Sequence, residues 1–295
     1  MKELREQLRA LLGGRYADDE LRTVINALCL EGLGLSPASV YLGESVSLSD
    51  AQKVWLSQAV GRLQMGEPLQ YVLGTAPFAG LELLVDGRVL IPRPETAGLV
   101  ALVQTLMQAS KWTGGQMRIL DVGTGSGCIA IALSKALSEA EVIACDVSEE
   151  ALEVARQNTE RAGAEVQFVR ADALDRVNMS MGQHVNEALP EGCACIVSNP
   201  PYIRQCERRQ MESRVTDWEP ELALFVPDDD PLLFYRALAK LGQTPVLAAG
   251  GWIAVEIHSA FAFEISALFT LWGYKDVSVK EDMYGRARFV TCRKG

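Results

Sequence analysis

The spacing of hydrophobic residues divides the chain into a helical first part and a mixed second part. Leu4, Leu8 and Leu12 lie on one face of a predicted helix that stops at Gly13 and Gly14. Further runs before residue 70 repeat the helical spacing, and no strand-like alternation interrupts them. The pattern therefore predicts a small bundle of four or five helices.

The pattern changes after residue 70. Apolar residues recur at every second position over residues 81–85, then Asp86-Gly87 supplies a turn, and a second apolar run covers residues 89–91. Two short apolar runs around an Asp-Gly pair are typical of a β-hairpin. The prolines of residues 92–94 end any regular element. We interpret this stretch as a connector between two domains.

After residue 94, short apolar runs alternate with helical segments. The predicted strands cover residues 118–122, 142–145, 166–169, 193–198 and 252–255, and two more lie near Val277 and Phe289. Strands that alternate with helices form a mainly parallel sheet with helices on both faces. The second part is therefore predicted to be a doubly wound α/β domain.

Charge and composition limit the kinds of partner that the protein is expected to bind. The 295 residues carry 28 basic and 38 acidic side chains, a net charge of −10, which does not favour nucleic acid as a partner. No apolar run approaches the roughly 18 residues of a membrane span, and charged residues occupy the start of the chain. We expect a protein of the cytoplasm with no membrane attachment.

Cysteine and histidine content argues against a metal site. The seven cysteines mostly lie in apolar runs, as small core residues do in a reducing compartment. Cys193 and Cys195 have the wrong spacing for a zinc site, and the chain has only two histidines. We expect no metal.

The first candidate binding motif is glycine-rich and follows the first strand of the predicted sheet. Its spacing is Gly-x-Gly-x-Gly over residues 123–127, and it opens a helix. Glycines let the backbone turn sharply and approach a ligand closely. Asp146 and Asp172 end the next two strands, where carboxylates can accept hydrogen bonds from a ribose and lie near an adenine edge. The combination predicts a nucleoside site, and the glycine spacing disfavours a dinucleotide.

The second candidate motif is Asn-Pro-Pro-Tyr, residues 199–202, directly after the fourth strand. Two prolines in series hold the backbone extended and remove two donors. The Asn199 side-chain oxygen and the Pro200 carbonyl can then form a pair of acceptors for an NH2 group on a planar carbon. Tyr202 offers a flat face against that plane. The loop faces the same cleft as the glycine motif.

These motifs resemble those of the class I S-adenosylmethionine-dependent methyltransferases, and among them the HemK/PrmC family, the N5-glutamine methyltransferases of peptide chain release factors. The linker adds two signatures of that family, Gly-x-Pro-x-x-Tyr-x-x-Gly over residues 66–74 and Arg-Pro-Glu-Thr over residues 93–96. Glu219-Pro220 matches a third. The resemblance covers nearly the whole chain.

The resemblance implies a fold and a division of the chain. A Rossmann-like, mostly parallel seven-stranded sheet is expected at residues 95–295, the methyltransferase domain. An all-helical domain that recognises the substrate protein is expected at residues 1–72, and a β-hairpin linker at residues 73–94.

The resemblance also implies an activity and its residues. It predicts methyl transfer from S-adenosylmethionine, which becomes S-adenosylhomocysteine, to the amide N5 of the glutamine in the GGQ motif of release factors. The expected cofactor residues are Gly123, Thr124, Gly125, Ser126, Gly127, Asp146, Asp172, Ala173 and Asn199. The expected substrate residues are Asn199, Pro200, Pro201, Tyr202 and Glu95, with Asn199 and Tyr202 as the catalytic pair.

Two alternatives use the same motifs. A ribosomal-protein glutamine methyltransferase would share the core motifs and differ mainly in its N-terminal region. An adenine-N6 methyltransferase of DNA or RNA would present the same acceptors and tyrosine to a flipped base. The acidic net charge and the Arg-Pro-Glu-Thr linker, residues 93–96, argue against the nucleic-acid enzyme.

Overall fold

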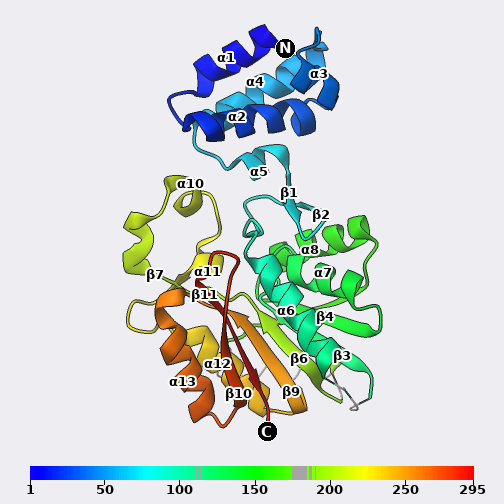
Figure 1. The fold of residues 1–295 in the computed structure, drawn as a ribbon, viewed down its shortest axis with the longest axis vertical. Coiled ribbons are helices and arrows are strands. Elements are labelled where there is room, and N and C mark those ends of the chain that lie inside the picture. Colours follow the sequence, from blue (N-terminus) through cyan, green and yellow to red (C-terminus); the bar gives the residue numbers. More distant parts are fainter. Residues whose placement is uncertain (111, 113–114, 175–184, 186–187, 190) are drawn as a thin grey trace. The chain divides into compact units, whose positions relative to one another are not determined.

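The computed structural model describes residues 1–110, 112, 115–174, 185, 188–189 and 191–295 (Figure 1). The backbone forms two compact units. Unit 1 combines Met1–Thr75 with Glu212–Trp218, and unit 2 combines Ala76–Met211 with Glu219–Gly295. Residues 212–218, which the sequence placed in the methyltransferase domain, therefore cluster with the helical part.

Unit 1 is the expected helical bundle. Its helices are α1 (Lys2–Leu12), α2 (Asp18–Ala27), the π-helix η1 (Leu28–Gly32), α3 (Pro37–Leu42), α4 (Asp50–Gln64), α5 (Leu69–Leu73) and α10 (Ser213–Thr216). The leucines at helical spacing face one buried core, in which Leu12, Leu28 and Leu63 are fully covered. Arg214 of α10 pairs with Glu20 of α2, and this ion pair accounts for part of the attachment of residues 212–218.

The linker hairpin lies earlier in the chain than predicted. β1 (Thr75–Phe78) pairs with β2 (Leu81–Leu84), and residues 85–91 contain no strand. Ala79 and Gly80 both have positive φ, 48° and 80°, as a tight two-residue hairpin turn requires. The Asp86 carboxylate instead accepts from the Arg88 backbone N–H at 3.0 Å, which closes a local turn. The prediction of a hairpin around Asp86-Gly87 was wrong for this reason.

Unit 2 contains one seven-stranded sheet. Its strands are β3 (Met117–Val122), β4 (Ala140–Asp146), β5 (Val166–Arg170), β6 (Cys193–Ser198), β9 (Leu247–Glu256), β10 (Lys275–Glu281) and β11 (Ala287–Arg293). Their order is β10-β11-β9-β6-β3-β4-β5, and only the pairs that involve β11 are antiparallel. A second, two-stranded sheet pairs β7 (Ile203–Arg204) with β8 (Phe225–Val226).

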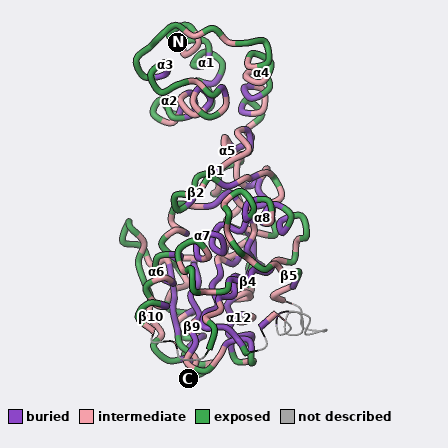
Figure 2. The backbone as a smooth tube through the Cα atoms, turned by 90° about the vertical axis from the view of Figure 1, so that its right-hand side faces the viewer, coloured by how far each residue is buried: buried purple, intermediate pink, exposed green. Residues whose placement is uncertain are grey.

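Helices cover both faces of the large sheet (Figure 1). They are α6 (Thr96–Ala109), α7 (Cys128–Ala136), α8 (Glu149–Ala162), α12 (Leu233–Gln243) and α13 (Ala262–Leu271). The short helical elements η2 (Gln205–Gln210), α11 (Glu221–Leu224) and η3 (Ser259–Phe261) lie in the connections of unit 2. Successive residues of a strand face opposite sides of the sheet and belong to two different cores. Leu120 and Ile143 belong to the core with α12 and α13, whereas Ile119 and Val142 belong to the core with α6 and α7. The buried positions of Figure 2 follow these strands.

The strand order places the candidate site. The chain runs outward from β3 to β5 and then returns to β6 on the other side of β3, so the order reverses between β3 and β6. Ligands of open α/β sheets bind beyond the carboxyl ends of strands at such a reversal. None of the helices in the described part of the chain is long and apolar enough to span a bilayer.

Candidate active site

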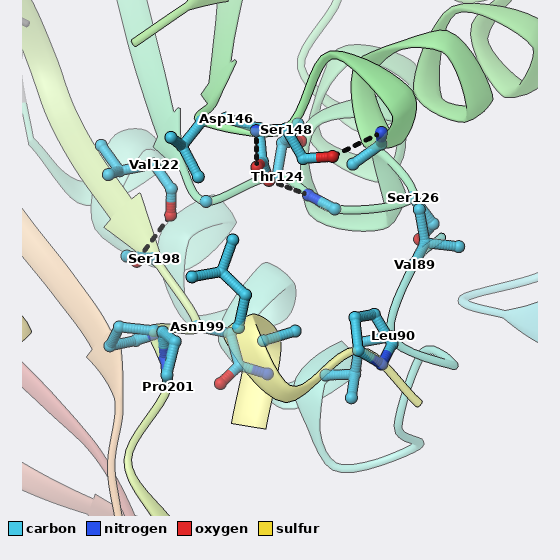
Figure 3. Close-up of a pocket in the computed structure, with 18 of the residues that line it drawn as sticks. Val89, Leu90, Val122, Thr124, Ser126, Asp146, Ser148, Ser198, Asn199 and Pro201 are labelled. Atoms are coloured by element: carbon cyan, nitrogen blue, oxygen red, sulfur yellow. Dashed lines mark hydrogen bonds between the residues drawn. The ribbon is translucent and has the colours of Figure 1, made fainter. Parts of the chain in front are cut away.

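A cavity of about 370 Å³ lies at the carboxyl ends of β3, β4 and β6, entirely within unit 2 (Figure 3). That volume is within the range of small-molecule sites. The predicted residues that line it are Gly123, Thr124, Gly125, Ser126, Asp146, Asp172, Ala173, Asn199, Pro200 and Pro201. The structure therefore brings both sequence motifs to one cavity. The predicted residues Gly127, Tyr202 and Glu95 do not line it.

The glycine loop shapes one wall. Gly123 and Gly125 have φ of +74° and +55°, and a Cβ built on either would meet no protein atom within 4 Å. Both residues line the cavity, so this open space is room for a ligand at the backbone. Gly127 acts differently, because its Cβ would lie 3.1 Å from side-chain atoms of Ala155 and Ile131. Its missing side chain permits close packing of α7 against α8.

Two carboxylates stand at the ends of β4 and β5. Asp146 accepts hydrogen bonds from the backbone N–H groups of Gly125 and Ser148, both at 2.9 Å (Figure 3). A carboxylate has about four acceptor positions, so Asp146 keeps about two for a ligand. Burial raises its pKa above the ordinary aspartate value. Asp172 accepts from the Leu174 N–H at 2.8 Å and borders the same cavity.

Asp121, near the end of β3, supports the glycine loop. It is fully buried, and the Thr124 hydroxyl donates to it at 2.7 Å. Burial raises the pKa of Asp121 to about 7, against an ordinary value of 3.8. The sequence places Asp121 only in the predicted strand of residues 118–122 and indicates no function for it. Its function in the structure is to hold Thr124, and with it the loop.

Asn199 is held in a defined orientation. Ser198 donates to the Val122 carbonyl at 2.6 Å, which ties the end of β6 to the end of β3 (Figure 3). The Asn199 amide nitrogen donates to the Thr96 hydroxyl at 3.1 Å. Thr96 in turn donates to a Glu256 carboxylate oxygen at 2.7 Å. These bonds use the Nδ2 side of Asn199 and leave its Oδ1 as an acceptor.

Tyr202 is anchored by the same carboxylate. Its hydroxyl donates to the other Glu256 oxygen at 3.1 Å, and its ring meets the His258 ring edge-on at 6.1 Å between centroids. Burial raises the pKa of Glu256 and that of Tyr202 above their ordinary values. Thr96 and Glu256 were not among the predicted site residues. Thr96 could have been found, because it belongs to the Arg-Pro-Glu-Thr signature.

The remaining wall comes from the linker. Residues 87–90, 92–93 and 220 line the cavity, and Glu219 holds this wall in place. Its carboxylate is buried and accepts from the Ile91 N–H at 3.1 Å and from the Arg93 guanidinium at 2.6 Å. The predicted substrate residue Glu95 lines a separate groove with Ala97, Lys280 and other residues. The structure thus does not bring Glu95 to the main cavity.

Comparisons with known proteins identify the family. The family model described as "PrmC N-terminal domain" matches residues 3–74, and the one described as "Methyltransferase domain" matches residues 119–184. The release factor glutamine methyltransferase of Bacteroides thetaiotaomicron is 40% identical over 294 residues, which cover 100% of both chains. The chain belongs to the release factor glutamine methyltransferase family. The Flavobacterium psychrophilum member is 33% identical and covers 98% of both chains.

A solved structure supports the fold. The N-terminal domain of human METTL16 in complex with SAH superposes with a TM-score of 0.52 at 17% identity, and the match covers 86% of each chain. This match and the strand order confirm the predicted class I methyltransferase fold. The relatives confirm the predicted family and the assignment as a protein-glutamine methyltransferase.

Proposed function

We propose that this enzyme transfers the methyl group of S-adenosylmethionine to the side-chain amide N5 of the glutamine in the GGQ motif of peptide chain release factors. The observation that carries the proposal is the orientation of Asn199. Its amide nitrogen is bonded to Thr96, so its oxygen is left to accept a hydrogen bond in the cavity that the glycine loop also lines. The names of the curated relatives supply the substrate class.

The residues present fit an adenosyl cofactor. The glycine loop leaves room at Gly123 and Gly125 where side chains would stand, and Asp146 retains acceptor positions for two ribose hydroxyls. Asp172 and Ala173 border the region suited to the adenine. When bound, S-adenosylmethionine supplies an electrophilic methyl group on a sulfonium.

The acceptor pair compensates for a poor nucleophile. The lone pair of an amide nitrogen is delocalised into its carbonyl. Asn199 Oδ1 and the Pro200 carbonyl accept from the two N–H groups, direct the nitrogen toward the methyl group and stabilise the positive charge that develops on it. The nitrogen forms the new N–C bond with its lone pair, the C–S bond breaks with its electrons on sulfur, and one N–H proton passes to water.

Positioning supplies most of the acceleration in this scheme. Holding two reactants in the reactive geometry can contribute about 7–11 kcal/mol. Pro200 and Pro201 fix the backbone of the turn, and the Ser198 bond to Val122 fixes its distance from the glycine loop.

The proposed function also implies a partner and a cellular compartment. The partner is a release factor, and helical unit 1, residues 1–75 with 212–218, is proposed to recognise it. All seven cysteines are free thiols, as expected in the reducing cytoplasm.

The decisive assay offers alternative substrates separately. The enzyme is incubated with isotopically labelled methyl donor and, in separate reactions, a purified release factor, a release factor whose GGQ glutamine is changed to alanine, ribosomal protein and duplex DNA. We expect label only on the unaltered release factor, and tandem mass spectrometry should locate one methyl group on that glutamine. Label on ribosomal protein or adenine would instead support one of the two alternatives.

A further inference from the structure

We infer that Thr96 and Glu256 form a positioning relay that sets which end of the Asn199 side-chain amide faces the substrate. The inference rests on the proposed function, because it assigns to this relay the acceptor that the substrate amide needs. Neither residue is assigned to bind the cofactor or to react. Each acts through Asn199 or Tyr202.

The direction of the hydrogen bonds follows from the chemistry of the groups. An ionised carboxylate only accepts, so the Thr96 hydroxyl must give its one hydrogen to Glu256 at 2.7 Å. The Thr96 oxygen then has only lone pairs left for Asn199, which lies 3.1 Å away. Asn199 must therefore turn its NH2 end to Thr96. Its oxygen is left for the substrate.

The reverse orientation would disable the turn. An Asn199 amide rotated by half a turn about its last torsion would present its NH2 group where the substrate NH2 group lies, and two donors would face each other. Oxygen and nitrogen of an asparagine amide have nearly the same shape, so packing alone selects weakly between the two orientations. The relay supplies the selection.

One carboxylate organises both ends of the turn. The second Glu256 oxygen accepts from the Tyr202 hydroxyl at 3.1 Å, so residues 199 and 202 are held by the same group. Glu256 is 1% exposed and Thr96 is 2% exposed, which protects both bonds from competition by water. Arg288 and Glu95 are the other charged groups that act on Glu256.

The relay also joins elements that are distant in sequence. Thr96 opens α6, Glu256 ends β9, and Asn199 follows β6. Thr96 itself also lines the cavity, so the start of α6 is thereby coupled to the end of the cavity at which Asn199 lies.

The test separates the hydroxyl from the volume of Thr96. Thr96→Val keeps the shape and removes the hydroxyl, and Thr96→Ser keeps the hydroxyl. We expect Thr96→Val to lower kcat for methylation of a release factor by on the order of 10-fold to 100-fold, while Kd for S-adenosylhomocysteine changes by less than about 3-fold. Thr96→Ser should recover most of the lost kcat. Glu256→Gln should lower kcat as well, because its NH2 group would replace one of the two oxygens that accept from Thr96 and Tyr202.

A matched control is available in α8. The Thr159 hydroxyl is buried and donates only to the Ala155 backbone carbonyl at 2.8 Å. Thr159→Val should leave kcat unchanged, and circular dichroism should confirm that all variants are folded.

The outcomes distinguish the inference from the proposed function. Wild-type enzyme that does not methylate the glutamine refutes the proposed function itself. Wild-type enzyme that methylates it, with Thr96→Val at normal kcat, refutes the relay alone. Equal losses in Thr96→Val and Thr96→Ser would also refute the relay, because the hydroxyl would then not be the determinant.

Discussion

At the scale of single residues, the direction of a few buried hydrogen bonds decides what the cavity can bind. Asn199 and Asp146 both form hydrogen bonds within the protein, and each side chain retains acceptor positions for a ligand. Under the proposed function, Asn199 keeps an acceptor for the substrate amide, and Asp146 keeps acceptors for the nucleoside. Acceptors at both ends match a ligand with two hydroxyls and a substrate with an NH2 group.

Removal of the Asn199 amide should stop transfer and spare cofactor binding. Asn199→Ala deletes one of two acceptors for the substrate N–H groups, and we expect kcat to fall by at least about 100-fold. Kd for S-adenosylhomocysteine, measured by calorimetry, should change by less than about 3-fold because the Asp146 and glycine-loop contacts remain. Near-normal turnover would refute the acceptor role.

Asp121 should make the stability of the cofactor-free protein depend on pH. Its pKa is about 7 in the folded state and 3.8 ordinarily, so between these values the folded protein holds a proton that the unfolded chain has released. Stability from this group therefore falls as pH rises through that window, by up to about 4 kcal/mol.

Asp121→Asn tests this dependence. The asparagine oxygen can still accept from Thr124, and the ionisation cost disappears. We expect the variant to be more stable than wild type by up to about 4 kcal/mol at about pH 8 and by about 2 kcal/mol or less near pH 5 in urea unfolding. A gap that does not shrink on acidification would contradict the assignment to Asp121.

At the scale of elements, close contacts set where α6 lies. Gly98 packs against Phe289 of β11, and a Cβ at residue 98 would stand 2.9 Å from the ring. Phe289 is only 3% exposed, so its ring has little room to move. Because Thr96 lies in the same turn of α6, this contact also fixes the start of the relay.

Gly98→Ala should therefore destabilise unit 2 and reduce activity together. We expect a loss of about 1–3 kcal/mol from overpacking, seen as a lower melting temperature, and a reduced kcat. Gly61→Ala in α4 is the matched control. A Cβ there would meet no atom within 4 Å, so alanine should stabilise the helix by about 0.5–1 kcal/mol. Equal effects at both positions would contradict the packing argument.

The sequence predicted the elements unevenly, for physical reasons. β6 is a short buried apolar run, so the prediction at residues 193–198 agrees with it. The two late strands that were predicted also agree with β10 and β11, although β10 is mostly exposed. The hairpin turn was predicted at the wrong residues because Ala79 adopts a positive φ, which is uncommon for alanine. The helix α6 was not predicted, because apolar residues occupy most positions around its own circumference and leave no clear polar face.

The site shows a similar division. Residues 123–126 and 199–201 could be placed on one cavity, because parallel strands bring their following loops to the same edge. The contacts among Thr96, Glu256 and Asn199 could not be predicted. Along the chain, Thr96 lies 103 residues from Asn199 and 160 residues from Glu256. Such contacts depend on the tertiary arrangement of α6 and β9.

At the scale of the whole molecule, charge favours a protein partner over a nucleic acid. The net charge of −10 opposes the exchange of counterions for basic side chains on which DNA affinity depends. We expect no saturable binding of duplex DNA below about 100 μM at physiological salt, measured by fluorescence anisotropy. Binding that weakens steeply with added salt would instead indicate a basic surface for nucleic acid.

The most direct test is a crystal structure with S-adenosylhomocysteine and a peptide that contains the release factor glutamine. The account predicts the sulfur beside the glycine loop of residues 123–126. It also predicts the glutamine amide nitrogen within hydrogen-bond distance of both Asn199 Oδ1 and the Pro200 carbonyl, on the side of the sulfur from which the methyl group leaves. A glutamine bound elsewhere, or an Asn199 oxygen directed away from the sulfur, would contradict it.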